Sequence, residues 1–376
     1  GYICTVRIAV NTRMLIQGTL NGIGWFSHEV LQRLVTNNPQ HEFLFLFDRE
    51  FSENFIYADN VWAKVLFPQA RHPLLYRMYF EYSIPKAIKQ WKADLFFSPD
   101  GFLSTRTRIP QVPVIHDLNF EHRPQDLPRA YSNYYRSYFP QFAKKARNII
   151  TVSEYSAKDI ATTYGIEPKK ISVAHNGCNK RFRPLTETEI KSIRAKYVFD
   201  SEYFVFVGSF SYRKNIHGII SAYELYRNTG GSSKLVMIGN PLWRYNEMDH
   251  ALAKSNYAED IIFLGHLPLD ELVKVKGAAN ALLFPSYFEG FGIPIIEAFG
   301  AGIPVICGNT TSIPEVAGNA ALYADPDDHA QISNHMLEVE KNNLLREKQV
   351  KLGFEQKNKF SWDNTANKVE MALFTY

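Results

Sequence analysis

Two glutamates, Glu289 and Glu297, stand eight positions apart on either side of a glycine-rich turn. The short apolar run Ala281–Phe284 predicts a buried strand before this turn, and Pro294 predicts the start of a helix with Glu297 in its first turn. Free N–H groups at a helix start attract phosphate, and carboxylates accept hydrogen bonds from sugar hydroxyls. This layout suits a phosphorylated ligand that is rich in hydroxyl groups.

Backbone amides just before that helix come from Gly290, Phe291 and Gly292, and the glycines let a ligand approach the chain closely. Glu297 also has a structural explanation, because the helix dipole favours a glutamate in the first turn by roughly 0.3–1 kcal/mol. Glu289 lies in a loop between an aromatic residue and a glycine, where no structural duty is equally obvious.

Two adjacent cations, Arg213 and Lys214, lie in the segment GSFSYRKN, which starts at Gly208 after an apolar run and precedes a helix-period segment. Cations at this place can neutralise a diphosphate leaving group. Taken alone, a solvated basic turn explains the pair better. Because Glu289 and Glu297 follow in the same predicted domain, we favour the functional interpretation.

His116 and Asp117 follow directly after an apolar strand in the segment VIHDLNFEHRP. Polar groups at the carboxyl end of a buried strand face the ligand crevice of an open α/β sheet. The alternative for His116 is a core histidine bonded to a backbone carbonyl. Ser153 and Glu154, also near a strand end, favour a helix cap over a reactive pair.

The sequence predicts neither a metal site nor a bound cofactor. The segment Asp-Pro-Asp at 325–327 is the one D-x-D match, and helix capping explains it because a helix-period segment starts at His329. No P-loop pattern occurs. The N-terminal glycines Gly18, Gly22 and Gly24 depart from the dinucleotide-binding spacing.

Short, uniformly apolar runs alternate with helix-period segments along the chain. Such runs are expected of parallel strands that are buried on both faces and joined by helical crossovers. The predicted strands are Arg7–Val10, Phe43–Phe47, Leu95–Ser98, Val112–Ile115, Ile149–Val152, Ile171–Val173, Tyr203–Val207, Lys234–Ile238, Ile261–Leu264, Ala281–Phe284, Pro304–Cys307 and Ala321–Tyr323.

The order strand, glycine loop, helix occurs twice, with helices around Ser27–Leu34 and Ile216–Arg227. We therefore predict an α/β protein with two Rossmann-like domains, at 1–182 and 183–360, and a ligand cleft between them. The segment 361–376 predicts a helix that Ser361 caps and that carries an apolar stripe. The stripe consists of Trp362, Ala366, Val369 and Leu373.

Composition excludes several classes of protein. A length of 376 residues favours two domains, and 45% hydrophobic with 21% charged residues is ordinary for globular proteins. The net charge of +4 is too small to argue for nucleic-acid binding. Three cysteines without CxxC spacing argue against a disulfide or zinc scaffold and fit a reducing, cytoplasmic compartment. No run has transmembrane length, and we predict no signal peptide.

Many of the aromatic residues gather in two basic stretches, at 71–93 and 129–148. Basic residues mixed with tyrosine, phenylalanine and tryptophan suit peripheral contact with an anionic membrane surface. Amphipathic helices packed on a sheet, with their lysines and arginines in water, explain the same pattern equally well.

Seven segments, in this order along nearly the whole chain, resemble the retaining glycosyltransferases of family four, which have the GT-B fold. They are NGIGWFSHEVL, VIHDL, VSEYSAKDI with HNG, VGSFSYRKN, PSYFEGFGIPIIEA, TSIPEVAGNAALYADPDD and FSWDNTA. The resemblance implies a first domain that binds the acceptor and a second that binds a nucleotide sugar. It also implies that the C-terminal helix returns to the first domain.

The family implies roles for the residues that match its motifs. Arg213 and Lys214 would hold the donor diphosphate, and Glu297 would bind the ribose hydroxyls. Glu289 would face the transferred sugar, and His116 would hold a sugar hydroxyl near the acceptor. The implied catalytic residues are thus His116, Glu289, Arg213 and Lys214.

Donor binding would extend over loops of both domains, with Gly22 and Gly24 bordering the donor phosphate and the acceptor. Ser209 stands where some members have a further arginine, so Arg213 and Lys214 must suffice, which suggests the branch that includes many bacterial mannosyltransferases. The implied donor-binding residues are Gly22, Gly24, Gly208, Arg213, Lys214, Gly290, Phe291, Gly292, Ile293 and Glu297.

The expected reaction is metal-independent transfer of a hexose from a nucleoside-diphosphate sugar to an acceptor hydroxyl, with same-face attack and retention. The family branch favours GDP-mannose over a UDP-sugar, and the base would be read by the loops Gly239–Tyr245 and Gly265–Leu267. A lipid-linked or other glycan of a bacterial surface polysaccharide is the expected acceptor. The alternatives are an epimerase or a phosphorylase on the same fold, and a non-catalytic subunit that binds sugar nucleotides.

Overall fold

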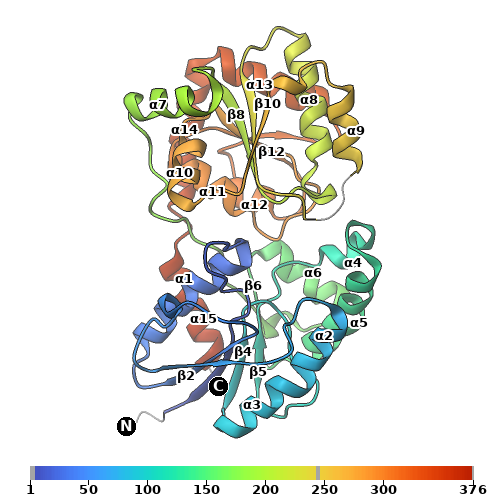
Figure 1. Cartoon of the computed structure of the whole chain (residues 1–376), viewed down its shortest axis with the longest axis vertical. Helices are drawn as coiled ribbons and strands as arrows, with labels where there is room; N and C mark the ends of the chain where they lie inside the picture. Colours follow the sequence, from blue (N-terminus) through green and yellow to red (C-terminus); the bar gives the residue numbers. More distant parts are fainter. Residues whose placement is uncertain (1–4, 243–245, 375–376) are drawn as a thin grey trace. The chain divides into compact units, whose positions relative to one another are not determined.

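The computed structural model describes residues 5–242 and 246–374, and within it the chain forms two compact units. Unit 1 comprises residues 1–176 with 361–376, and unit 2 comprises residues 177–360 (Figure 1). Each unit is a parallel sheet with helices on both faces, which confirms the predicted α/β class. Among the described residues, no helix is long and apolar enough to cross a membrane.

Unit 1 is built on a five-stranded parallel sheet in the order β3-β2-β1-β4-β5. The strands are β1 Arg7–Asn11, β2 Glu42–Phe47, β3 Val61–Val65, β4 Leu95–Ser98 and β5 Gln111–Pro113. A parallel bridge from Val114 to Ile150 continues the sheet into the pair β6 Ile149–Thr151 and β7 Ile171–Val173. Most of these strands are apolar at successive positions because helices cover both faces.

Helices enclose the sheet of unit 1. Helices α1 (Gly22–Asn37) and α15 (Trp362–Phe374) pack against each other, and the predicted stripe of α15 is buried. The C-terminal helix therefore returns to the first domain, as expected. A second apolar cluster joins the sheet to α2 (Pro73–Met78), the π-helical turn Tyr79–Ser83, α3 (Ile84–Trp91) and α5 (Arg129–Lys145). Helix α4 (Asn119–His122) contacts α5, and α6 (Glu154–Tyr164) contacts β6 and β7.

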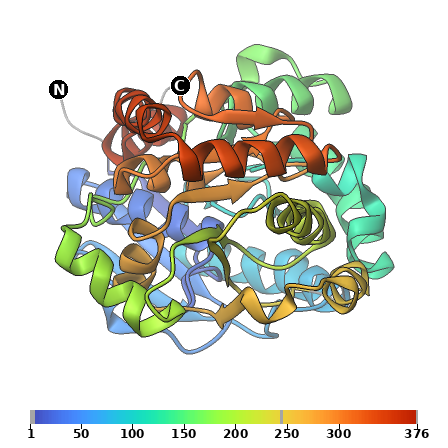
Figure 2. The same cartoon turned by 90° about the horizontal axis from the view of Figure 1, so that it is seen from above.

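Unit 2 has a six-stranded parallel sheet in the order β10-β9-β8-β11-β12-β13, which is the Rossmann order. The strands are β8 Tyr203–Val207, β9 Lys234–Ile238, β10 Ile261–Gly265, β11 Ala281–Phe284, β12 Val305–Gly308 and β13 Leu322–Ala324. Viewed from above, helices flank this sheet on both sides (Figure 2).

One group of helices in unit 2 comprises α8 (Ile216–Asn228), α9 (Asn246–Lys254) and α13 (His329–Lys341), in which α8 contacts both of the others. The other group comprises α7 (Glu187–Val198), α10 (Leu269–Gly277), α11 (Ile293–Ala301), α12 (Ile313–Ala317) and α14 (Asn343–Lys357). The predicted strands of both units are present, with ends that differ by no more than two residues.

Strand β3 is missing from the sequence prediction. It lies at the edge of the sheet, and Trp62, Ala63 and Lys64 are exposed. An edge strand needs no continuous apolar run, because only part of it is covered.

The sequence predicts the domain division after residue 182, whereas the structure divides the chain after Asn176. The reason is that the linking segment packs on α11 of unit 2. The Cys178 thiol donates to the Ile296 carbonyl at 3.4 Å, and a Cβ added to Gly300 would lie 3.0 Å from the carbonyl oxygen of Phe182.

Candidate functional site

The site in unit 2 lies where the strand order reverses. After β8 the chain adds β9 and β10 on one side and then places β11 on the other side of β8. The carboxyl ends of β8 and β11 are therefore neighbours, and the loops that follow them diverge at a topological switch point. Lys214 follows β8 and Glu289 follows β11, so the fold brings these distant sequence segments together.

Glu289 binds both predicted cations. Its Oε1 accepts from Lys214 Nζ at 2.5 Å, and its Oε2 accepts from Arg213 Nη1 at 3.0 Å. The same Arg213 nitrogen donates to the Phe288 carbonyl at 2.7 Å. Two cations thus share one carboxylate, and the cluster keeps one net positive charge.

Burial decides the electrostatics of this cluster, because Glu289 and Lys214 are 5% and 8% exposed. Burial by itself opposes ionisation of Glu289, but Lys214 and then Arg213 outweigh it and lower the pKa of this carboxyl below its ordinary value. Glu289 is therefore an anion at neutral pH. Its structural duty, which the sequence did not reveal, is to hold the two cations in place.

Helix α11 starts as predicted at the glycine-rich turn. Gly292 precedes its first residue with a φ of +107°, and Pro294 is in the first turn. The helix begins at Ile293, so Glu297 lies in its second turn rather than the predicted first turn. The explanation of Glu297 by the helix dipole is therefore weakened, because that effect falls off within the first turn.

Glu297 instead forms an ion pair with Lys276, the penultimate residue of α10. Lys276 is completely buried, and its ammonium also lies 4.7 Å from the ring centroid of Phe182. The sequence did not single out Lys276. A lysine near the end of a helix resembles a solvated residue, and only the packing of α10 against α11 reveals the pair.

Asn215 is a second residue that the sequence prediction missed. It is fully buried, has a left-handed φ of 57° and caps α8 by accepting from the Gly218 N–H at 3.1 Å. Its amide donates to the carbonyls of Pro285 and Pro326, at 3.1 and 2.7 Å. Asn215 therefore ties the Arg213–Lys214 turn to the loops after β11 and β13.

The predicted base-recognition loops follow neighbouring strands at the same edge of the sheet. A Cβ added to Gly239 would lie 1.9 Å from the Gly208 carbonyl oxygen, and Gly239 donates its N–H to Gly265 at 2.8 Å. Glycine at 239 thus lets the loops after β8, β9 and β10 approach one another. The part of the predicted loop at 243–245 lies outside the described residues.

Gly22, Gly24 and His116 belong to unit 1. Gly22 is the first residue of α1, and the Gly24 N–H donates to the capping side chain of Asn21 at 2.9 Å. A Cβ at Gly24 would lie 2.9 Å from the Met14 carbonyl oxygen, whereas one at Gly22 would meet no atom within 4 Å. Gly24 therefore has a structural reason to be glycine, and Gly22 keeps room for a ligand.

His116 combines the two alternatives considered for it, a position at a strand end and a hydrogen bond to a backbone carbonyl. It stands at the strand end, and its Nε2 lies 2.8 Å from the Pro99 carbonyl, to which it must donate. Burial lowers its pKa, and its ring contacts Phe26 edge to face at 5.1 Å. With Nε2 protonated, Nδ1 of the neutral ring is an acceptor for a hydroxyl.

We expect His116→Gln to flatten the pH dependence of stability. A histidine whose pKa is lowered by folding destabilises the folded state as the pH falls below the unfolded value of about 6.5. The stability difference between wild type and variant should therefore change between pH 7.5 and 5.5, by at most about 1.4 kcal/mol per pH unit. Urea unfolding measures this, with the exposed His122, changed to Gln, as control. Parallel curves for wild type and His116→Gln would contradict a neutral His116.

A further polar network lies at the switch point of unit 1, after β1 and β4. Arg13 Nε donates to Asp100 at 2.5 Å, and the Asn11 amide donates to the other oxygen of Asp100 at 2.7 Å. The sequence did not single out these residues, although their positions directly after apolar runs are a signal that could have identified them.

The helix caps differ in one respect from the prediction. Ser153 and Ser361 cap α6 and α15 as predicted, by accepting from the N–H groups of Ser156 and Asn364. Helix α13 is capped by Asp328, rather than by a residue of 325–327. Asp325 accepts from the Asp327 N–H in the preceding turn instead. Among the residues that the structure describes, no group of three or more potential metal ligands occurs.

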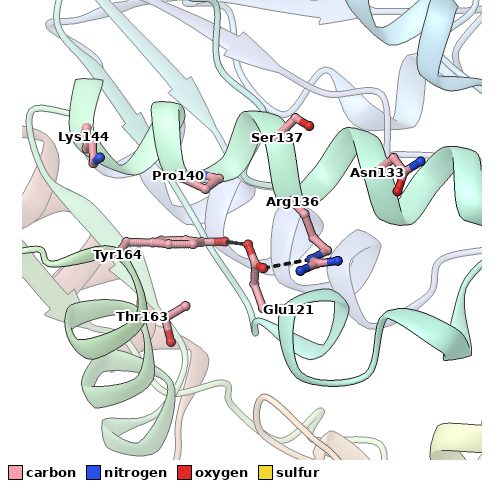
Figure 3. A pocket seen from close by; sticks show the side chains of 8 residues that line it. All are labelled: Glu121, Asn133, Arg136, Ser137, Pro140, Lys144, Thr163 and Tyr164. Carbon is pink, nitrogen blue, oxygen red and sulfur yellow. Dashed lines mark hydrogen bonds and ion pairs between the residues drawn. The ribbon is translucent and has the colours of Figure 1, made fainter.

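An open groove of about 630 Å³ lies in unit 1 between α4, α5 and α6 (Figure 3). Glu121 lies at its centre, where it accepts from the Tyr164 hydroxyl at 2.9 Å and pairs with Arg136 at 3.3 Å. None of the predicted site residues lines this groove, so we do not assign it to the reaction.

Comparison with protein families identifies the chain. Residues 20–182 match the model "Glycosyltransferase Family 4", and residues 189–356 match "Glycosyl transferases group 1". Together these matches span most of the chain and coincide with the two sheet domains. The chain belongs to the family four glycosyltransferases.

This glycosyltransferase is similar to two O-antigen chain mannosyltransferases. It is 28% identical over 361 residues to O-antigen chain mannosyltransferase B of Escherichia coli, covering 93% of this chain and 94% of that protein. It is 30% identical over 234 residues to O-antigen chain mannosyltransferase RfbU of Salmonella typhimurium, covering 61% of each.

Solved structures show the GT-B fold of the glycosyltransferase. WaaG, a glycosyltransferase involved in lipopolysaccharide biosynthesis, aligns with a TM-score of 0.78 at 15% identity, covering 98% of this chain and all of WaaG. HepE of Anabaena, in complex with UDP and glucose, aligns with a TM-score of 0.77 at 14% identity, covering 99% of this chain and all of HepE. The predicted fold is confirmed.

Proposed function

We propose that the protein transfers a hexose, with mannose favoured, from a nucleoside-diphosphate sugar to an acceptor hydroxyl with retention at the anomeric carbon. The observation that carries the proposal is the cluster of the buried Lys214 and Glu289 with the partly buried Arg213 at the switch point of unit 2. The mannose preference rests on similarity to the O-antigen mannosyltransferase of Escherichia coli, which extends over 94% of that protein.

The proposed reaction breaks the bond between the anomeric carbon and the diphosphate oxygen, and the bonding electrons leave with the diphosphate. The acceptor oxygen forms the new bond on the same face, and its proton passes to the departing phosphate. Negative charge grows on the diphosphate, so fixed cations stabilise the transition state more than the ground state. Arg213 and Lys214 supply this charge, together with the amides of Gly290, Phe291 and Gly292 and the start of α11 at Ile293.

The same cations are the reason to propose a reaction without a metal ion or another cofactor, since they provide the positive charge that a divalent cation provides in other transferases. Glu297 would accept hydrogen bonds from the donor ribose, and Gly208 would let the diphosphate approach the loop after β8. From unit 1, Nδ1 of His116 would accept from a sugar hydroxyl, with Gly22 and Gly24 bordering the ligands.

The acceptor we propose is a glycan or lipid-linked saccharide of a bacterial surface polysaccharide, at the inner face of the cytoplasmic membrane. The names of the O-antigen relatives support this class of acceptor. Cys178 and Cys307 are unpaired and buried, which is compatible with a reducing compartment.

Thermal unfolding with a panel of nucleotide sugars tests the donor. A ligand at 100 times its dissociation constant adds about 2.7 kcal/mol of stability, and we expect GDP-mannose to produce the largest shift. Product NMR with a mannosyl acceptor then tests the stereochemistry. An inverted anomer, or a changed sugar without acceptor as an epimerase would produce, would overturn the proposal.

A further inference from the structure

Helices α2 and α3 and the π-helical turn between them form one continuous helical segment of unit 1 (Figure 1). Its outer face carries an apolar stripe, since large side chains at every fourth position are exposed to water. The nearby Phe67 is 76% exposed, and the stripe consists of Leu74, Met78 and Tyr82, which are 64%, 47% and 54% exposed.

The stripe is separate from the core face of the same segment. Tyr76, Tyr79, Phe80, Ile84 and Ile88 are buried in the apolar cluster of unit 1, so the core is complete without the stripe. Apolar side chains that gather on the outer face of a helix, in addition to those on its core face, are typical of a binding surface.

Phe67 and the stripe form one surface. The Ser83 hydroxyl donates to the Phe67 carbonyl, which fixes the Phe67 loop against the helical segment. The Arg106 guanidinium lies 4.1 Å from the ring centroid of Tyr82 and donates to its hydroxyl at 3.1 Å. We call Phe67, Leu74, Met78 and Tyr82 the α2–α3 face.

The exposed charges of the segment 67–92, which carries the α2–α3 face, have one sign. Residues 67–92 contain five exposed cations and a single carboxylate, Glu81. Glu81 is 5% exposed, and its oxygens accept from the N–H and hydroxyl of Thr105. The carboxylate of Glu81 therefore adds no negative charge to the exposed surface of this segment. The exposed cations are Arg71, Arg77, Lys86, Lys89 and Lys92.

The second basic aromatic stretch of the sequence behaves differently. In α5 the side chains of Tyr134, Phe139 and Phe142 are buried, while Tyr131, Tyr135 and Tyr138 pack against the core cluster. The aromatic residues of α5 thus serve the fold, and the structure separates two stretches that the sequence could not distinguish.

We propose that the α2–α3 face docks on the surface of an anionic lipid bilayer. Exposed leucine, methionine and aromatic side chains enter the boundary between headgroups and acyl chains, and the surrounding lysines and arginines attract anionic headgroups. A protein partner fits less well, because three of the five exposed cations are lysines, which are depleted at protein interfaces. The inference rests on the proposed function in one respect, namely that docking brings the enzyme to a lipid-linked acceptor.

Flotation of the full-length chain with lipid vesicles tests the proposal. We expect binding to vesicles of equal parts phosphatidylglycerol and phosphatidylcholine, weaker binding at high salt, and little binding to pure phosphatidylcholine. The variant L74S/M78S/Y82S should lose about tenfold or more in partitioning, because the apolar anchors are removed. The matched control is L344S/M371S, which changes two apolar residues that are 77% and 66% exposed elsewhere.

A charge variant tests the electrostatic part. R77Q/K86Q/K89Q should weaken partitioning about fivefold for each cation, which corresponds to about 1 kcal/mol per charge. The matched control K341Q/K348Q/K351Q neutralises three exposed cations of unit 2 and should bind like wild type.

Two results would overturn the membrane proposal. The first is that the wild-type chain binds neither kind of vesicle, in which case the α2–α3 face would serve a protein partner. The second is that L74S/M78S/Y82S binds vesicles as well as wild type does. Transfer to a soluble acceptor should be unaffected in this variant. If vesicles bind but no nucleotide sugar does, the proposed function fails and the docking surface stands. If donors bind and vesicles do not, only the docking surface fails.

Discussion

Replacing Lys214 by methionine is expected to reduce kcat/KM for transfer by about 10²- to 10³-fold, the loss found when one preorganised group that stabilises developing negative charge is removed. Methionine keeps the length and most of the volume of the side chain, so packing around the 8%-exposed Lys214 is retained. Initial rates with saturating acceptor measure the effect. Turnover like that of wild type would remove Lys214 from the mechanism.

The stability of the Lys214→Met variant separates catalysis from folding. Glu289 loses one of two cationic partners but keeps Arg213. We therefore expect a smaller loss than the roughly 3–5 kcal/mol found when a buried charge loses its whole partner. The double variant Lys214→Met with Glu289→Gln should regain stability and remain inactive. Lys196→Met, at a pair that is half exposed, is the control that should retain full activity.

The direction in which acid changes the stability of these variants can be predicted. Because folding lowers the pKa of Glu289, this group stabilises the native state above its unfolded pKa of about 4.3. That stabilisation disappears as the pH falls through the lower, folded pKa. In Lys214→Met the folded pKa of Glu289 should rise, so the variant should lose less stability than wild type between pH 5 and 2.

Replacing Glu297 by alanine is expected to have the largest effect on stability. The change leaves the fully buried Lys276 with no other ion pair among the described residues. A buried charge that loses its partner costs about 3–5 kcal/mol. The ribose-binding role that the family implies for Glu297 predicts a loss of activity, and its ion pair with Lys276 in the structure predicts a loss of stability as well. Urea unfolding and initial rates, compared for the same preparation, measure them.

Glu297→Gln separates the two effects. The amide oxygen can still accept from Lys276, so most of the stability should be retained. Hydrogen bonds from the donor hydroxyls to a charged carboxylate contribute about 1.5–3 kcal/mol, and their weakening should raise KM for the donor about tenfold to a hundredfold. Unchanged donor KM in this variant would exclude Glu297 from ribose binding, whatever its stability.

Motifs at strand ends were predictable because a buried parallel strand is continuously apolar and ends where polar residues begin. This rule located Arg213, Lys214, Glu289 and His116 from the chain alone. It could not place β3, whose Trp62 and Lys64 are exposed at the sheet edge. The rule also could not distinguish the stretch 71–93 from 129–148, because composition does not say which face of a helix is covered.

The sequence by itself determined the alternation of strands and helices, the two-domain α/β class and the motifs of the family, because each depends on local periodicity and spacing. Tertiary structure alone decided which charges meet. Glu289 lies 75 positions from Lys214 along the chain, and Glu297 meets Lys276 across two helices. The physical reason is that ion pairs and buried polar groups depend on strand order and packing, which bring together residues that no local pattern connects.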